Sequence, residues 1–465
     1  MKSKLVNKNE THIGQRSSAG SRLKSQNKGS INSDFMESAE IRDPIHGYIF
    51  ATDIERRIID TTTFQRLRRI RQLAGCHLVY PGGQHSRFEH VIGAMYLAGK
   101  TGKVLELLET TNFGPGDTEM LRLAALLHDV GHGPFSHMFE EVMAERTRFT
   151  HEDMTTRIIL GSEIGEILAR AGISKKKLSE LAIGKSKTNP RFMNDVIGGG
   201  LSADIMDYLP RDSYFTGVEY GKVDVHRIIN SFEVIEGRLA IGQAALFAFE
   251  ALMIARYEMF RAVYFHRTVR AAELMLIKSM ILADKELALT DLSLSNYLTL
   301  TDEVTLERIR TMKTGSDKDL KRAKLLADNY YKRRLLKCVF ERSFQRRDKF
   351  LTSIFTQKSI RDQLAEDIAS SSGVDPDDVY IDVPTAPSIP VSSTRESFEK
   401  ITLVNQKGWE DEHHELSVKD MPLVSTIAGF MDIMRVYTSA ENRAKVQKGV
   451  GIVLNKEGFE TKISM

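Results

Sequence analysis

Apolar residues recur every three or four positions along most of the chain, which is the period of a helix with one buried face. Between residues 53 and 74, Ile54, Ile58, Leu67 and Ile70 fall on one face, while arginines occupy much of the other. We expect those arginines to be solvated, with contact to phosphate or another subunit as the alternative. The segments that this pattern predicts to be helical are 53–74, 88–97, 121–127, 161–195, 244–286 and 287–370.

Short runs of β-branched and aromatic residues between turn residues predict a few strands. The first is a hairpin within Ile41–Phe50, and the others are 379–383, 399–404 and 434–438. The later strands follow several prolines, which interrupt helices. The predicted fold is therefore mainly α, with a helical core, a few short β-strands and a smaller α+β C-terminal lobe.

Composition divides the chain into four parts. Residues 1–38 are rich in Ser, Lys, Asn and Gly, and we expect a disordered basic tail because they can bury little apolar surface. A catalytic core is predicted at 39–295 and a helical extension at 296–375. The remaining residues, 376–465, are predicted to form the α+β region.

Bulk composition limits the classes of protein to consider. The chain has 465 residues, 42% of them hydrophobic, and no apolar run near the about 20 residues of a membrane span. Two isolated cysteines, Cys76 and Cys338, favour a reducing, cytoplasmic setting. The net charge of +3 argues against dedicated nucleic-acid binding, so we expect at most weak contact through the basic tail.

The densest chemistry lies in residues 126–137, which hold three histidines and a carboxylate. The apolar helix before them should deliver His128 and Asp129 to one buried polar spot. Glycines and a proline then end the helix, so His132 and His137 are predicted to lie on a turn. A buried His-Asp pair can also be purely structural. It indicates a metal site only if other parts of the chain supply further ligands.

Three other segments supply such residues. Arg87 and His90 are three positions apart and share one helical face. In a second segment, Asp204, Tyr208 and Asp212 recur every four residues. Their side chains share one helical face if the helix continues past Pro210.

The third segment begins at Thr150, which has N-cap spacing to Asp153. His151 would then sit at the positive end of a helix, which predicts a neutral imidazole. Further along, Arg256 and Tyr264 share a face of the helix predicted at 244–286.

Two imidazoles and two carboxylates form a mixed nitrogen and oxygen set that suits one divalent ion per site, Mn, Mg, Fe or Zn. The predicted metal ligands are His90, His128, Asp129 and Asp204.

The ordered pattern of these four residues resembles the HD-domain phosphohydrolases. Further motifs resemble the deoxynucleoside triphosphate triphosphohydrolase branch, similar to the vertebrate-type enzymes that carry a sterile alpha motif, although none is recognised here. The resemblance covers roughly residues 40–290. Its motifs are Asp43–Gly47, Phe64–Arg68, Gln72-Leu73, His85–His90, His128–His137 and Asp207–Asp212.

The resemblance implies hydrolysis of dNTPs to deoxynucleoside and inorganic triphosphate. It implies that Arg87 and Arg256 contact phosphates, and that Tyr264 packs near the sugar, where it could exclude a 2′-hydroxyl. Gln72, Tyr208 and Asp212 match residues that recognise the 3′-hydroxyl. His132, His137 and His151 match the catalytic histidines near the α-phosphate, with Glu140 or Glu152 to orient them.

The resemblance also implies a homo-oligomer, a dimer or tetramer, with an activating nucleotide. Asp60, Gln65, Arg68 and Arg227 match activator-binding positions. Yet Ala39, Gly242 and Ala244 stand where regulated members carry basic residues, and Ile205 replaces a phosphate-binding lysine. An incomplete activator site is therefore expected.

Two alternatives remain open. One is another HD phosphohydrolase, acting on nucleoside monophosphates, cyclic dinucleotides or an alarmone. The other is a non-catalytic nucleotide sensor that keeps the helical core.

Overall fold

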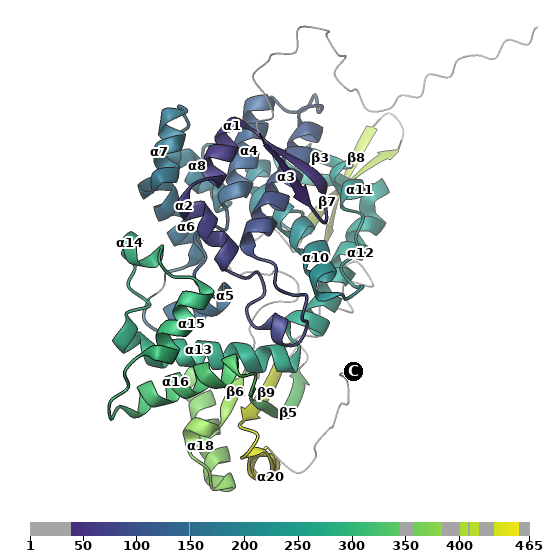
Figure 1. Cartoon of the computed structure of the whole chain (residues 1–465). Helices are drawn as coiled ribbons and strands as arrows, with labels where there is room; N and C mark the ends of the chain where they lie inside the picture. The colour runs from purple at the N-terminus through teal and green to yellow at the C-terminus, as the bar shows by residue number, and fades with distance from the viewer. Residues whose placement is uncertain are drawn as a thin grey trace, which may run out of the picture.

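The computed structural model describes residues 39–147, 149–344, 357–383, 400–407, 410–417 and 432–454, and most of them are helical (Figure 1). This confirms the predicted mainly α fold. The basic tail at 1–38 lies outside the described residues, as does Glu399, where one strand was predicted to begin.

The predicted hairpin is present at the start of the described chain. β1 (Ala39–Asp43) and β2 (Gly47–Ala51) pair antiparallel, with Ala39 opposite Ala51. Gly47 has a φ of 77°, a left-handed conformation that glycine adopts without a steric penalty. The Asp43 carboxylate accepts hydrogen bonds from the backbone N–H groups of Ile45 and His46, which fixes the turn.

The single helix predicted at 53–74 is wrong, because the segment forms α1 (Asp53–Ile59), α2 (Thr62–Gln65) and the 3-10 helix η1 (Arg66–Arg69). Thr52 and Thr61 each cap a helix start with the side-chain oxygen, so the second cap interrupts the first helix.

One arginine of this segment is internal rather than solvated. Arg66 is buried and donates to the carbonyl oxygens of Leu300, at 2.9 Å, and His132, at 2.8 Å.

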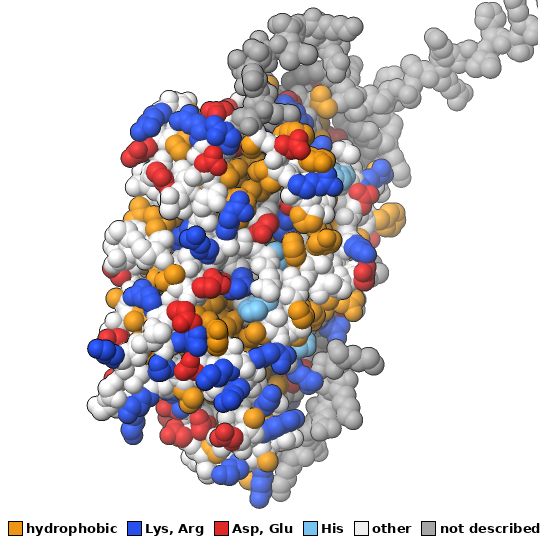
Figure 2. All heavy atoms as spheres, viewed as in Figure 1, with side chains coloured by type: hydrophobic (Ala, Val, Ile, Leu, Met, Phe, Trp, Pro, Cys, Tyr) orange, Lys and Arg blue, Asp and Glu red, His pale blue; other side chains and the backbone are white. Residues whose placement is uncertain are grey.

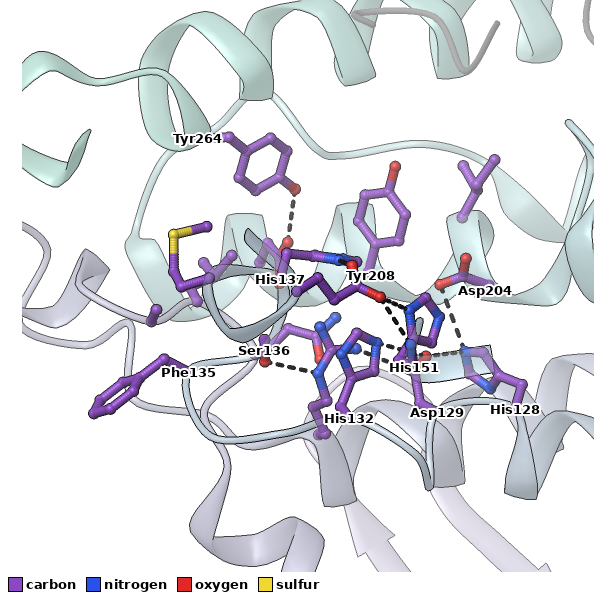
Figure 3. A pocket seen from close by; sticks show the side chains of 18 of the residues that line it. His128, Asp129, His132, Phe135, Ser136, His137, His151, Asp204, Tyr208 and Tyr264 are labelled. Carbon is purple, nitrogen blue, oxygen red and sulfur yellow. Dashed lines mark hydrogen bonds and ion pairs between the residues drawn. The ribbon is translucent and has the colours of Figure 1, made fainter. Parts of the chain in front are cut away.

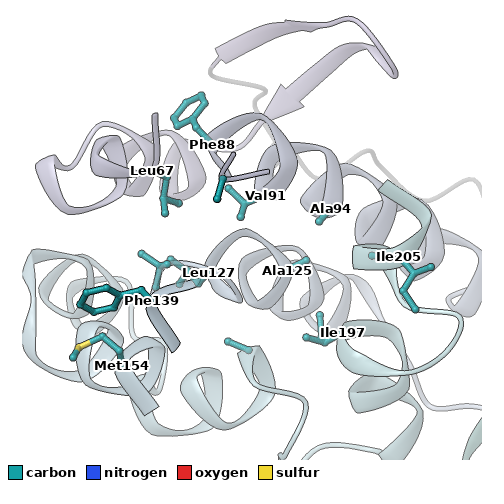
Figure 4. Packing of buried hydrophobic residues seen from close by; sticks show 14 of the residues in the cluster. Leu67, Phe88, Val91, Ala94, Ala125, Leu127, Phe139, Met154, Ile197 and Ile205 are labelled. Carbon is teal, nitrogen blue, oxygen red and sulfur yellow. The ribbon is translucent and has the colours of Figure 1, made fainter. Parts of the chain in front are cut away.

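The core is built on α3 (Arg87–Leu105), which packs against α4 (Pro115–Leu127) and α10 (Ala203–Thr216). Figure 4 shows Val91 and Ala94 of α3 facing Leu127 and Ala125 of α4. A Cβ on Gly102 of α3 would lie 2.5 Å from the Thr118 hydroxyl, so glycine permits the close approach of α3 and α4.

Shorter helices surround this core. They are η2 (Cys76–Leu78), α5 (His137–Ala144), α6 (His151–Gly161), α7 (Glu163–Arg170), α8 (Lys175–Ala182), α9 (Arg191–Gly198) and α11 (Val225–Ile229). Thr150 caps α6 with the predicted capping box to Asp153. His137 is the first residue of α5, so of the two histidines predicted on a turn only His132 lies there.

A hairpin that the hydrophobic pattern did not predict follows α11. It consists of β3 (Phe232–Ile235) and β4 (Arg238–Gly242), and β4 pairs in parallel with β7 (Lys400–Lys407). β8 (Glu410–Ser417) completes this sheet, whose order is β3-β4-β7-β8.

The long helix predicted at 244–286 is interrupted. After the 3-10 turn η3 (Gln243–Ala245) come α12 (Leu246–Met259), the π-helical turn η4 (Phe260–Tyr264) and α13 (Arg267–Leu287). Phe265 follows the π turn, and His266 then caps α13, because its Nδ1 accepts the N–H of Thr268. Such π turns are frequent at functional sites, and this one carries Tyr264 into the cavity described below.

The last part of the chain mixes helices and strands. It contains α14 (Leu294–Tyr297), α15 (Asp302–Thr311), α16 (Lys318–Tyr331), β5 (Lys337–Phe344), α18 (Lys358–Ser372), η5 (Pro376–Asp378), β6 (Tyr380–Asp382), β9 (Asp432–Thr438) and α20 (Arg443–Val453). β5 lies inside the segment predicted to be helical, and the sheet has the order β5-β9-β6. Figure 1 shows α18 and α20 beside this sheet at the lower end of the molecule.

Residues of this last part hold a turn of the core. The Tyr297 hydroxyl donates to the carbonyl oxygen of Gly131 at 2.7 Å. The Asp302 carboxylate accepts the N–H of Phe135 at 2.6 Å and that of Arg71 at 3.0 Å. The turn 131–136, which carries His132, is therefore fastened from beyond residue 295.

The face of the molecule in Figure 2 shows no single dominant charge. On the face in Figure 2, Lys and Arg side chains are interspersed with Asp and Glu. Among the described helices, none has both the length and the apolar composition needed to span a bilayer.

Gly93 generates a stability prediction. A Cβ at this position in α3 would lie 1.9 Å from Asp207 Oδ1 and 2.4 Å from a guanidinium nitrogen of Arg211, both in a buried network. We expect Gly93→Ala to lower the free energy of unfolding by about 1–3 kcal/mol, measured by urea denaturation.

Gly116→Ala is the matched control. Nothing lies within 4 Å of a Cβ at Gly116, in the first turn of α4, so this change should be neutral or stabilising by up to about 1 kcal/mol. Equal stability of the two variants would contradict the steric argument.

Candidate active site

A cavity of about 710 Å³ lies between α10, the turn 131–136, and the starts of α5, α6 and α13. Most of the predicted site residues line it. They are His128, Asp129, His132, His137, His151, Asp204, Gln72, Arg87, Tyr208, Asp212, Arg256 and Tyr264. The structure thus brings together residues that are up to 192 positions apart, from Gln72 to Tyr264.

His128 and Asp204 face each other at one end of the cavity (Figure 3), and His90 completes a cluster of two imidazoles and a carboxylate. His90 Nε2 lies 3.2 Å from Asp204 Oδ1, and His128 Nε2 lies 3.9 Å from the same oxygen. Ligand atoms of all three lie within 4.8 Å of one another. Asp129 joins them, with Oδ1 3.3 Å from His128 Nε2.

The Nδ1 atoms of both rings make hydrogen bonds on the side away from the cluster. His90 Nδ1 donates to Asp207 Oδ2 at 2.8 Å, and His128 Nδ1 donates to the carbonyl oxygen of Ala125 at 2.7 Å. Both Nε2 atoms are buried and make no hydrogen bond within the described residues. Because a hydrogen bond to the far ring nitrogen fixes the orientation of a histidine ligand, the donor set fits a divalent cation.

The carboxylates also control the charge of His90. Burial lowers the pKa of this ring, but the neighbouring Asp204 and Asp207 outweigh it and raise the pKa to about 10. The same negative charge would favour a divalent cation on Nε2, where a metal and a proton compete for the nitrogen.

Asp129 is buried and ionised. Burial raises its pKa, but the positive charge of Arg87 and the neighbouring His128 and His132 hold it well below the usual range. Arg87 forms an ion pair with Asp129, and its Nε donates to Ser136 Oγ at 2.7 Å.

Three further histidines gather next to Asp129 (Figure 3). The rings of His132 and His151 stack with centroids 4.1 Å apart. Glu140 hydrogen-bonds to Nδ1 of His151 and, at 3.0 Å, to Nδ1 of His137. Of the two carboxylates expected to orient these histidines, Glu140 contacts them, whereas Glu152 pairs with Lys185.

The expectation of a neutral His151 is wrong. Burial lowers its pKa, but the charge and hydrogen bond of Glu140 outweigh burial and raise it. The helix N-terminus, on which that expectation rested, is outweighed by this carboxylate at close range. His132 shifts the other way, since burial, Arg87 and His151 lower its pKa well below the usual value.

The other end of the cavity is rich in acceptors. α10 continues through Pro210, so Asp204, Tyr208 and Asp212 all face the cavity as the spacing of four indicated. Asp212 accepts the Tyr264 hydroxyl at 2.6 Å. The buried Oε1 of Gln72 has no hydrogen-bond partner among the described residues.

Four buried residues behind the site were not predicted to act there. They are His46, His85, Asp207 and Arg211, and all lie within the motifs noted in the sequence. Their contacts join segments more than 100 residues apart, which spacing alone cannot reveal.

The structure does not gather the four predicted activator residues in one chain. Arg68 donates to Gln65 at 2.8 Å, and Asp60 ends α1 nearby. Arg227 lies on α11, on the other side of the molecule in Figure 1, and donates to the carbonyl oxygen of Ala244.

Comparison with known protein families gives two matches. Residues 87–188 match the HD domain, and residues 223–409 match an HD associated region. The first contains His90, His128 and Asp129, and the second contains Arg256 and Tyr264.

Similar proteins occur in distant organisms. The chain is 36% identical over 281 residues to an uncharacterized protein of Methanocaldococcus jannaschii, covering 58% of this chain and 57% of that protein. It is 30% identical over 364 residues to the deoxynucleoside triphosphate triphosphohydrolase SAMHD1 homolog of Dictyostelium discoideum. This match covers 73% of this chain and 66% of that protein. The chain thus spans less than two thirds of the length of these relatives.

A solved structure shares the fold. The crystal structure of a hypothetical protein from Aquifex aeolicus superimposes with a TM-score of 0.69 at 26% identity. The match covers 89% of this chain and 99% of that one.

The ligand cluster generates a metal-binding prediction. Asp204 is 31% exposed, and its carboxylate faces both free Nε2 atoms, so its loss should remove a ligand without unfolding the chain. We expect Asp204→Asn to bind Mn²⁺ at least about tenfold more weakly, measured by calorimetry and by metal content after dialysis. Glu219→Gln, an exposed carboxylate paired with Lys222, serves as control and should bind as the wild type does. Unchanged metal content in Asp204→Asn would contradict the assignment.

Proposed function

The chain is an HD-domain protein with an HD-associated region, and on that premise we propose that it is a metal-dependent enzyme that hydrolyses dNTPs to deoxynucleoside and inorganic triphosphate. The observation that carries the proposal is the gathering of three kinds of group at one cavity. They are a candidate cation site, a histidine cluster with a carboxylate, and a set of hydroxyl acceptors. The similarity to the Dictyostelium triphosphohydrolase supports the choice of substrate.

His90, His128, Asp129 and Asp204 would hold the ion, which is Mn, Mg, Fe or Zn on the basis of the donor set. A divalent ion bound there supplies Lewis-acid activation of the α-phosphoryl group.

Arg87 and Arg256 provide fixed positive charge for the triphosphate. Burial lowers the pKa of Arg256 to about 10, so the guanidinium remains charged at neutral pH. Ile205 stands beside Asp204, where the triphosphohydrolases that the chain resembles carry a lysine, so fewer cations contact the phosphates.

In the proposed reaction a water molecule attacks the α-phosphorus and the bond to the 5′-oxygen breaks. The leaving 5′-oxygen then needs a proton. His151, whose pKa Glu140 raises, can donate it, while His132, whose pKa is lowered, lies against Asp129. His137 shares the Glu140 carboxylate and would contact the phosphate.

The sugar would lie at the acceptor end. Gln72 Oε1 and the Asp212 carboxylate can accept the 3′-hydroxyl, with Tyr208 beside them. The Tyr264 ring, held by its hydroxyl on Asp212, is placed to exclude a 2′-hydroxyl.

Regulation by a nucleotide belongs to the same proposal. Asp60, Gln65 and Arg68 lie apart from Arg227, so one activator could touch all four only at a contact between two chains. We therefore propose a homo-oligomer, a dimer or tetramer, in which an activating nucleotide binds between subunits.

The proposed reaction predicts which products appear. Purified protein incubated with Mn²⁺ and each dNTP, singly and in mixtures, should release deoxynucleoside and triphosphate, separated by chromatography. Asp129→Ala should abolish both products, because it removes a predicted ligand and the partner of Arg87.

Other outcomes of this assay point elsewhere. Turnover only in mixtures would support the activator site, and monophosphate products would favour another HD phosphohydrolase. Tight binding without turnover would favour a nucleotide sensor.

The second prediction concerns His151. His151→Asn keeps a donor near Glu140 but has no acidic proton, so kcat should fall about 10²–10⁴-fold with metal content unchanged. Since the imidazolium is the active form, wild-type kcat should decline as pH rises through the raised pKa of His151, and the variant should lack that decline.

His77→Asn is the control. This partly buried histidine packs against Tyr330 outside the cavity and should leave kcat near the wild-type value. A His151→Asn enzyme of full activity would exclude the proposed proton donor.

A further inference from the structure

His85 is a buried histidine that touches the acceptor end of the cavity from behind. Its Nε2 donates to Asp212 Oδ1 at 2.8 Å, and its side chain is 0% exposed. The ring stacks on Phe215, with centroids 4.6 Å apart and planes 13° apart. Neither the cation site nor the histidine cluster uses this residue.

The hydrogen bond from His85 helps to fix the orientation of the Asp212 carboxylate. One carboxylate oxygen receives the His85 N–H and the other receives the Tyr264 hydroxyl at 2.6 Å, so the group cannot rotate. Each carboxylate oxygen can accept more than one hydrogen bond, and Asp212 lines the cavity. A hydroxyl in the cavity thus meets an acceptor whose direction is already set.

The backbone of His85 holds the second acceptor. The N–H of Gln72 donates to the His85 carbonyl oxygen at 3.0 Å. On either side, Arg71 bridges to Ser86, and the N–H of Arg87 donates to the Ile70 carbonyl oxygen at 2.9 Å. His85 therefore joins the strand-like segment that carries Gln72 to the helix that carries Asp212.

We propose that His85 is a positioning residue that sets the preference for a sugar 3′-hydroxyl. The inference rests on the proposed function, because it concerns the sugar of the same nucleotide. A donor hydroxyl between Gln72 Oε1 and Asp212 satisfies the buried acceptor that otherwise lacks a partner. The His85 N–H keeps Asp212 aimed at that hydroxyl.

Two substitutions separate the hydrogen bond from the packing. His85→Phe keeps an aromatic ring against Phe215 and removes the donor, whereas His85→Gln places an amide N–H close to the position of Nε2. Each is assayed with a dNTP and with the 2′,3′-dideoxynucleoside triphosphate of the same base. The pair of substrates differs only in the 3′-hydroxyl.

We expect the wild type to prefer the dNTP, and His85→Phe to lower kcat/KM for the dNTP about tenfold or more. For the dideoxy substrate the change should stay within about twofold, and His85→Gln should restore most of the preference. Phe215→Leu removes the stacking partner but not the hydrogen bond. It should lower Tm while leaving the ratio between the two substrates unchanged.

A purely structural His85 gives a different result, in which both substrates lose kcat/KM by the same factor, and that outcome overturns the inference. Dissociation constants of the two nucleotides, measured by calorimetry in a chelator that prevents turnover, test it independently of catalysis. Equal affinities in the wild type also overturn it. If the protein shows no turnover but binds the nucleotide with the 3′-hydroxyl more tightly, the proposed reaction is contradicted and the role of His85 is supported.

Discussion

The structure depends on one buried carboxylate, Asp207, which pairs with three cationic or donor groups at once. Its oxygens accept His46 Nε2 at 2.7 Å, His90 Nδ1 at 2.8 Å and two nitrogens of Arg211. A buried charge is tolerated only when it is paired and hydrogen-bonded, so these partners cannot move independently. Asp43, bound to Arg211 at 2.8 Å, extends the network to the β1–β2 hairpin. The hairpin, α3 and α10 thereby meet directly behind the candidate metal ligands.

The cavity in front of that network is organised by opposed charges. Glu140 raises the pKa of His151, while burial and Arg87 lower that of His132, although the two rings stack. Neighbouring groups with pKa values pushed apart are the usual arrangement of an acid beside a neutral partner. The two pKa values differ because the Glu140 carboxylate contacts His151, whereas Arg87 and burial act on His132.

Local pattern placed the candidate ligands on or beside helices, and the structure agrees: His90 lies on α3, His128 and Asp129 directly follow α4, and Asp204 lies on α10. The hydrophobic pattern did not predict where a helix is interrupted by a side-chain cap or by a π turn. The Thr61 cap divides the predicted helix at 53–74, and the π turn before Phe265 interrupts the one at 244–286. Contacts such as Glu140 with His151, or His85 with Asp212, depend on packing between elements, which one sequence without its fold does not disclose.

The fastening of the turn 131–136 by Tyr297 and Asp302 has a consequence for biosynthesis. These bonds span 166 and 167 residues, so the segment that bears His132 emerges from the ribosome long before its partners. A nascent chain that ends before residue 297 holds every candidate metal ligand but lacks the groups that satisfy the Gly131 carbonyl and the Phe135 amide. The bonds that hold this turn can therefore form only after residue 302 has been synthesised, and a shorter translation product carries the candidate ligands without them.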